Sequence, residues 1–205
     1  MSATGEKETT RVEAFSDGVF AIAITLLVLE IKVPHVPDGR LFQSLLELWP
    51  SYFAYATSFF TIGVMWINHH RMFSHLGRTD GWLLMLNGLL LFSICFVPFP
   101  TAVVAAYLGH PGARTAACFL AVVYVGIAIA FNLLWRYASS EDRTPRLLHD
   151  RADIAQVRGI RAAYAWGPFM YVATLLISLL DANAGVAANL ALAVYWAIPQ
   201  RARET

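Results

Sequence analysis

Charged residues are scarce in this chain. Of its 205 residues, 14% are Asp, Glu, Lys or Arg and 58% are hydrophobic, whereas ordinary soluble domains carry about 25% charged residues. The composition therefore predicts an integral membrane protein with the lipid bilayer as its surroundings. The 15 basic and 14 acidic residues leave a formal net charge of +1, so the charge balance gives no indication of a nucleic-acid partner.

Cysteines and catalytic motifs are also few. Cys95 and Cys118 lie in apolar stretches without ligand-like spacing, so we expect small buried residues rather than a disulfide or a metal site. The chain lacks a serine within a glycine elbow and the HExxH motif, so we expect neither an enzyme nor a cofactor. It also lacks the TVGYG sequence of carbonyl-lined potassium filters. Any ion selectivity must therefore come from another device.

Long apolar segments are abundant. A spanning helix needs about 20 mostly apolar residues, and six segments reach or approach that length, at about 12–33, 45–70, 81–108, 113–138, 160–181 and 184–200. We predict an all-α integral membrane protein in which residues 1–205 form one domain of six transmembrane helices, with a cytoplasmic loop at about 139–159. Pro98 and Pro100 remove backbone donors and should kink or break the third helix.

Basic residues predict the orientation, because Lys and Arg accumulate on the cytoplasmic side of membrane proteins. The N-terminal tail, the second and fourth connections and the C-terminal tail hold 12 of the 15 basic residues. The other connections hold Lys32, Arg40 and Arg114. We therefore expect both termini to be cytoplasmic in a multi-pass protein of the cell membrane. The first ten residues, MSATGEKETT, lack the apolar core of a secretory signal, so the first span should be retained.

The first apolar segment opens with polar groups. Asp17 lies deep enough that burying it unpaired would cost several kcal/mol, so a partner is expected. Candidate partners are His69, His70 and Arg71, which end the second segment on the same side, and Asn87 in the third. Their matching depths predict a polar network between helices. Adjacent histidines point about 100° apart on a helix, so we do not expect this pair to bind one metal ion.

An apolar stripe follows on the same helix. Ile22, Leu26 and Leu29 fall at i, i+4 and i+7, with Thr25 beside them, so they share one face. Periodicity alone leaves open whether this face lines something, packs in a core or meets lipid.

The stretch RVEAFSDGVFAIAITLLVLEI, in which three residues separate Arg11 from F-S-D, resembles the transmembrane protein 175 family, whose animal members are lysosomal potassium channels. WINHHRMF also resembles its prokaryotic members. A single six-helix unit is similar to the prokaryotic single-repeat form, which the resemblance implies is a homotetramer with the first helices around a central pore.

The resemblance also implies residue roles. Ile22 would form the narrowest hydrophobic ring, with Leu26 and Leu29 as further rings, and Thr25 would influence ion preference. The interhelical polar network would comprise Arg11, Phe15, Ser16, Asp17, His69, His70 and Asn87.

Three functions remain in competition at this stage. The leading prediction is passive conduction of potassium, and of other monovalent cations, through a hydrophobic gate without a carbonyl filter. The alternative is a proton-coupled secondary transporter that uses Asp17 and the His69/His70 region. A non-conducting scaffold or an intramembrane enzyme is the third.

Overall fold

The computed structural model describes residues 3–37, 39–140, 146–150 and 152–198, with side chains from residue 8. Its helices are α1 (Ala3–Leu26), the short 3-10 helix η1 (Leu27–Glu30), α2 (Leu41–Glu47), α3 (Trp49–Phe73), α4 (Gly81–Phe96), α5 (Pro98–Tyr107), α6 (Ala113–Ala138), α7 (Ile154–Leu180) and α8 (Ala182–Ala197). The described residues contain no named strand, so the all-α prediction is confirmed for this part of the chain.

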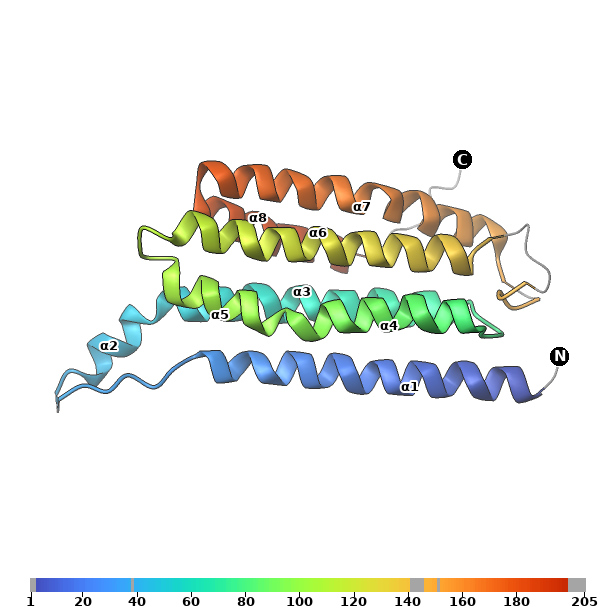
Figure 1. Ribbon diagram of the computed structural model, residues 1–205, viewed down its shortest axis with the longest axis horizontal. Helices are drawn as coiled ribbons and strands as arrows, with labels where there is room; N and C mark the ends of the chain where they lie inside the picture. Colours follow the sequence, from blue (N-terminus) through green and yellow to red (C-terminus); the bar gives the residue numbers. More distant parts are fainter. Residues whose placement is uncertain (1–2, 38, 141–145, 151, 199–205) are drawn as a thin grey trace.

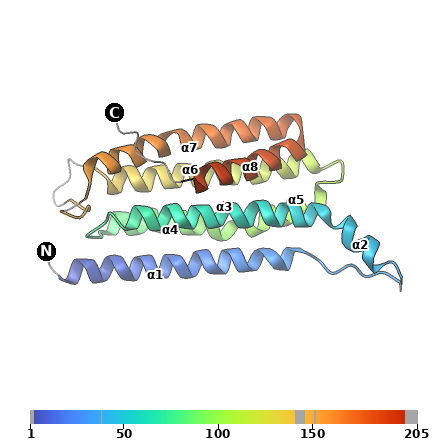
Figure 2. The same cartoon turned by 180° about the vertical axis from the view of Figure 1, so that it is seen from behind.

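The long helices run side by side in layers. α1 forms one edge and packs on α3 and α4, α6 lies centrally, and α7 and α8 cover the opposite side (Figures 1 and 2). The start of α1, the α3–α4 turn and the α6–α7 connection gather at one end of the bundle, and α2 projects from the other (Figure 1). The connections expected to be rich in basic residues therefore share one end.

Four stretches of the described chain are long and apolar enough to cross a membrane: Glu8–Glu30, Gly81–Tyr107, Ala113–Ala138 and Ile154–Leu180. The two remaining expected spans correspond to α3 and α8. α3 has 25 residues but includes His69, His70 and Arg71, and α8 has only 16 residues. The six-span count therefore stays a prediction.

Several boundaries differ from those expected. α1 begins at Ala3 rather than near residue 12, because a polar first turn does not prevent a helix from continuing. α7 begins at Ile154, so it takes in the end of the expected loop at 139–159. Asp153 starts this helix, because its carboxylate accepts hydrogen bonds from the backbone N–H groups of Ala155 and Gln156. Residues 141–145 and 151 of that loop, and the last residues expected in the sixth span, lie outside the described residues.

The third expected span is broken at its prolines, as predicted. α4 ends at Phe96 and α5 begins at Pro98. A cluster of hydroxyl groups packs beside the break: Ser58 and Thr101 lie 2.6 Å apart through their oxygens, and the Tyr124 hydroxyl donates to Ser58 Oγ at 3.1 Å. The Thr101 hydroxyl in turn donates to the carbonyl of Val97, immediately before the first proline. The Val97 carbonyl also accepts from the backbone N–H of Thr101, so the hydroxyl cluster packs beside the break without replacing the donors that the prolines lack.

Both cysteines are free thiols, but their expected burial is wrong. Cys95 is exposed on α4 and Cys118 is half-buried on α6. An apolar sequence context does not distinguish a residue in the bundle core from one on the outer face, since both surroundings are apolar.

Candidate pore-lining helix and its polar anchor

α1 carries two stripes with opposite surroundings. Ser16, Phe20 and Ala23 on α1 and Leu27 at the start of η1, spaced at i, i+4, i+7 and i+11, are each at most 1% exposed. They pack against α3 and α4, so this stripe fixes the helix to the rest of the chain.

The other stripe has no cover from the described part of its own chain. Ile22 is 60% exposed, Leu26 43% and Leu29 61%, and Ala14, Gly18 and Ala21 on the same helix are exposed too. Thr25 is exposed as well, and its hydroxyl donates to the carbonyl of Ile22 at 2.9 Å. The four residues expected to face the pore, three on α1 and Leu29 on η1, are therefore all exposed on the side away from the bundle.

A buried chain of hydrogen bonds joins three helices at the level of Ser16. The Asn87 amide on α4 donates from Nδ2 to Ser16 Oγ on α1 at 3.0 Å, and its Oδ1 accepts from Nε2 of His69 on α3 at 2.9 Å. Ser16 Oγ donates to the carbonyl of Val12 at 2.8 Å. Asn87 thus bridges α1 and α3, and all three side chains are at most 3% exposed.

Aromatic rings fix the orientation of His69. Its ring stacks on Phe73, with centroids 4.2 Å apart and planes at 21°, and lies 5.4 Å from the ring of Phe20. Because Asn87 Oδ1 can only accept, His69 Nε2 carries a proton, while Nδ1 is buried without a partner in the described structure. The imidazole of His69 therefore donates from Nε2 to Asn87, which in turn contacts Ser16 on α1.

A second, outer pair of contacts joins α1 to α3. The indole Nε1 of Trp66 donates to Asp17 Oδ1 at 2.8 Å, and His70 Nδ1 lies 2.7 Å from Glu13 Oε1. The rings of Trp66 and His70 stack with centroids 6.4 Å apart. These groups are more exposed than the inner chain, so each contact contributes less to stability than a buried one.

Two of the residues expected in the polar network are exposed in the single chain. Arg11 and Phe15 continue the exposed stripe of Ile22 at helical spacing, and Phe15 is 67% exposed. Conversely, Trp66 and Glu13 take part although sequence reasoning did not place them in the network. Helical spacing would have found both, since Trp66 is four residues before His70 and Glu13 is four before Asp17.

The arrangement does not resemble a proton relay or a metal site. Asp17 bonds to Trp66, His69 to Asn87 and His70 to Glu13, so these groups have three separate partners. Among the described residues, no three His, Cys, Asp or Glu side chains gather where they could hold a metal ion.

Four helices are long and apolar enough to cross a membrane. The first helix is held by polar groups on one side and exposes apolar side chains on the other. These features are those of a helical integral membrane protein. A family model described as the endosomal/lysosomal potassium channel TMEM175 matches residues 11–98. A protein of Chamaesiphon minutus named as a potassium channel is 50% identical over 205 residues, covering 98% of this chain and 100% of that protein. A potassium channel of Streptomyces collinus is 44% identical over 195 residues, covering 94% and 93%.

The fold agrees with this relationship. The crystal structure of a lysosomal potassium-selective channel TMEM175 homolog from Chamaesiphon minutus superposes with a TM-score of 0.84 at 48% identity, covering 93% of this chain and 97% of that one. The chain belongs to the TMEM175 family. The family is one of ion channels, which is not a class of enzyme.

Proposed function

We propose that this chain forms a homotetrameric, potassium-permeable cation channel in which the exposed stripe of α1 lines a central pore. The proposal rests chiefly on that stripe, because its apolar side chains are exposed on a helix whose opposite face is buried. We take potassium as the conducted ion because relatives that match almost the whole chain are named as potassium channels.

Ile22 forms the narrowest ring of this pore, with Leu26 and Leu29 as further rings. Four isoleucine side chains that converge on an axis exclude water, and a bare cation cannot replace its hydration shell with methyl groups. The ring is therefore a closed gate until it widens. Conduction through this pore is passive and follows the electrochemical gradient of the ion.

Ion preference in this pore does not come from a carbonyl filter. The hydroxyl of Thr25 donates to the backbone of its own helix, and its oxygen keeps lone pairs that can still accept from water or contact a cation. Potassium passes more easily than sodium because the larger cation loses its water at a lower free-energy cost. The resulting selectivity is modest, and other monovalent cations also pass.

We further propose that both termini are cytoplasmic, as the basic residues predict. The end of the bundle that carries the α1 start and the α3–α4 turn (Figure 1) then faces the cytoplasm. The polar anchor of Ser16, Asn87 and His69 then lies on the cytoplasmic side of the Ile22 ring, in a protein of the cell membrane. Its role is to hold α1 against α3 and α4 rather than to coordinate the conducted ion.

The gate assignment predicts the effect of shortening Ile22. Ile22→Ala and Ile22→Asn should raise potassium flux in reconstituted liposomes, because a wider or more polar ring wets more easily. Lowering the barrier by about 1.4 kcal/mol corresponds to about a tenfold rise. The control is Ile129→Ala on α6, which removes the same atoms from an exposed position outside α1. Equal flux from parent, Ile22 variants and control would contradict the gate.

A further inference from the structure

A proline inside α7 determines how α6 and α7 are aligned. Pro168 has no N–H, so the carbonyl of Tyr164, four residues earlier, lacks its helical donor. Asn132 on α6 replaces that donor, because its Nδ2 donates to the Tyr164 carbonyl at 2.8 Å. This hydrogen bond sets the register of two antiparallel helices that lie side by side (Figures 1 and 2).

The register places two arginines at nearly the same level. Arg136 lies four residues after Asn132 on α6, and Arg161 lies three residues before Tyr164 on α7. At about 1.5 Å per residue, they are displaced by about 6 Å and about 4.5 Å toward the end of the bundle that carries the α1 start. Arg136 stands in the last turn of α6, where the apolar stretch Ala113–Ala138 ends. Both arginines are therefore near the level of the lipid headgroups.

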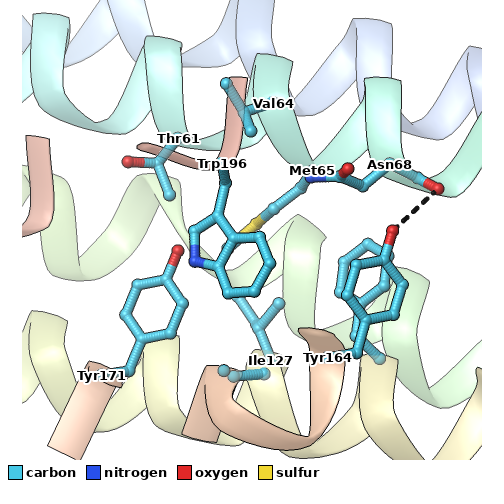
Figure 3. Close-up of a pocket in the computed structure, with 11 residues that line it drawn as sticks. Thr61, Val64, Met65, Asn68, Ile127, Tyr164, Tyr171 and Trp196 are labelled. Atoms are coloured by element: carbon cyan, nitrogen blue, oxygen red, sulfur yellow. Dashed lines mark hydrogen bonds between the residues drawn. The ribbon is translucent and has the colours of Figure 1, made fainter. Parts of the chain in front are cut away.

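Both arginines are on the outer side of the α6–α7 contact. The inner side is occupied by Tyr164, whose hydroxyl points to the backbone oxygen of Asn68 on α3 at 3.5 Å (Figure 3), whereas Arg136 and Arg161 are exposed. α7 lies at the edge of the bundle opposite α1 (Figures 1 and 2). In the proposed channel, with α1 at the axis, this outer side therefore faces lipid.

Neither arginine is neutralised within the described part of the chain. The side chains of Arg136 and Arg161 make no hydrogen bond or ion pair there, although each guanidinium offers five donors. Two like charges at one level repel each other. An anion shared by the two guanidinium groups would replace this repulsion with charge-assisted hydrogen bonds.

Apolar residues continue from each arginine into the span. Leu133 lies three residues before Arg136 on α6, and it is 46% exposed. Ala165 and Val172 lie four and eleven residues after Arg161 on α7, and both are exposed. At these spacings each set shares the face of its arginine. The surface is thus cationic at the headgroup level and apolar toward the bilayer centre, in the same order as the phosphate and acyl chains of a phospholipid.

We propose that Arg136 and Arg161 bind the phosphate of an anionic phospholipid, whose acyl chain lies along the α6–α7 contact over Leu133, Ala165 and Val172. Arginine suits this role because its planar fork of donors matches the oxygens of a phosphate. Basic pockets between membrane helices recognise anionic headgroups in this way. A zwitterionic lipid carries a cation next to its phosphate, so it binds less tightly.

Native mass spectrometry of the purified full-length protein in detergent tests the proposal. It measures the affinities for phosphatidylglycerol and for phosphatidylcholine with the same acyl chains. The parent protein should bind phosphatidylglycerol at least about tenfold more tightly, because both arginines attract its net negative charge. Equal affinities would overturn the proposal. Displacement of phosphatidylglycerol by an excess of inorganic phosphate would also overturn it, since the site would then be one for free anions.

Variants of the two arginines test the location. The double variant Arg136→Gln/Arg161→Gln should lose the preference for phosphatidylglycerol, and the double variant Arg136→Lys/Arg161→Lys should keep part of it, because lysine retains the charge without the planar fork. Arg114→Gln is the matched control, since Arg114 is exposed at the opposite end of α6, and it should bind as the parent does.

A preference that persists in the glutamine variant would place the lipid elsewhere and refute the site. An equal loss of preference in Arg114→Gln would also refute it, because overall charge would then decide binding. Ion flux enters none of these measurements, so failure of the lipid site and failure of the proposed channel are distinguishable.

Discussion

Asn87 joins α1 and α3 through a single buried amide. Its Nδ2 donates to Ser16 Oγ and its Oδ1 accepts from His69 Nε2, so no smaller side chain makes both hydrogen bonds. Membrane hydrogen bonds between helices average only about 0.6 kcal/mol. The cost of leaving two buried polar groups without their partner is larger, at about 1–3 kcal/mol.

Asn87→Leu keeps the side-chain volume and removes both hydrogen bonds. We expect it to lower the free energy of unfolding by about 1–3 kcal/mol, because His69 Nε2 is left buried and unpaired. The measurement is chemical or thermal unfolding of the detergent-solubilised protein. Asn183→Ala, at an exposed position on α8, should change stability by less than about 0.5 kcal/mol. Indistinguishable unfolding of Asn87→Leu and the parent would show that the amide does not anchor α1.

His75 predicts a pH dependence outside the spanning helices. Burial beside Trp135 lowers the pKa of His75 below 6.5, against the opposing effect of Asp153 and with a further lowering from His149. Below pH 6.5 the unfolded chain therefore binds more protons at this position than the folded chain. Stability should fall as the pH decreases through 6.5 toward the lowered value.

The His75→Asn variant should lose this part of the pH dependence between pH 7 and pH 5, while keeping the backbone carbonyl that accepts from His149 N. Unfolding midpoints measured across that range provide the comparison. His110→Asn, at an exposed position at the opposite end of the bundle, is the control. If parent and His75→Asn lose stability equally on acidification, other groups carry the dependence.

At the scale of elements, the α7–α8 hairpin depends on one glycine. A Cβ on Gly185 would lie 2.6 Å from Cα of Ser178, closer than real contacts allow. Nearby, Thr174 Oγ1 donates to Asn189 Oδ1 at 3.0 Å, and Asn189 Nδ2 donates to the carbonyl of Gly185. Close approach at Gly185 thus brings the polar groups of the two helices within reach of each other.

Gly185→Ala should therefore destabilise the protein by about 1–3 kcal/mol through overpacking, despite the better helix propensity of alanine. Thermal unfolding in detergent measures the effect. Gly126→Ala on α6, where an added Cβ meets nothing within 4 Å, should be neutral or stabilising. Equal thermal unfolding midpoints for Gly185→Ala and Gly126→Ala would show that α7 and α8 can move apart at Gly185 without loss of stability.

Individual elements also show what sequence reasoning can reach. The break at Pro98 and the apolar length of α6 followed from local chemistry, because a missing N–H and a run of apolar residues act within one segment. Which face of α1 is buried did not follow, since core and lipid are equally apolar. The place of Arg11 and Phe15 in the polar network stays a prediction, and Trp66 was overlooked because its polar N–H belongs to a largely apolar ring.

The whole molecule raises the question of what covers the exposed stripe of α1. A pore and a lipid-facing surface both accommodate apolar side chains, but only a pore brings equivalent residues of several subunits close together around an axis. Substituting cysteine at one stripe position separates the two, because a ring of thiolates binds a soft metal ion such as Cd²⁺ and a lipid-facing thiol does not.

With Cys95 and Cys118 replaced by serine, Ile22→Cys should make potassium flux through reconstituted channels sensitive to Cd²⁺. The ion would bridge thiolates across the pore and block conduction, and a chelator should restore the flux. Ala23→Cys is the matched control. Ala23 is next to Ile22 in the sequence, but it is only 1% exposed and packs inside the protomer. Cd²⁺ should leave that variant unaffected. Block of Ala23→Cys without block of Ile22→Cys would reverse the assignment of the two faces, and insensitivity of both would remove Ile22 from the axis.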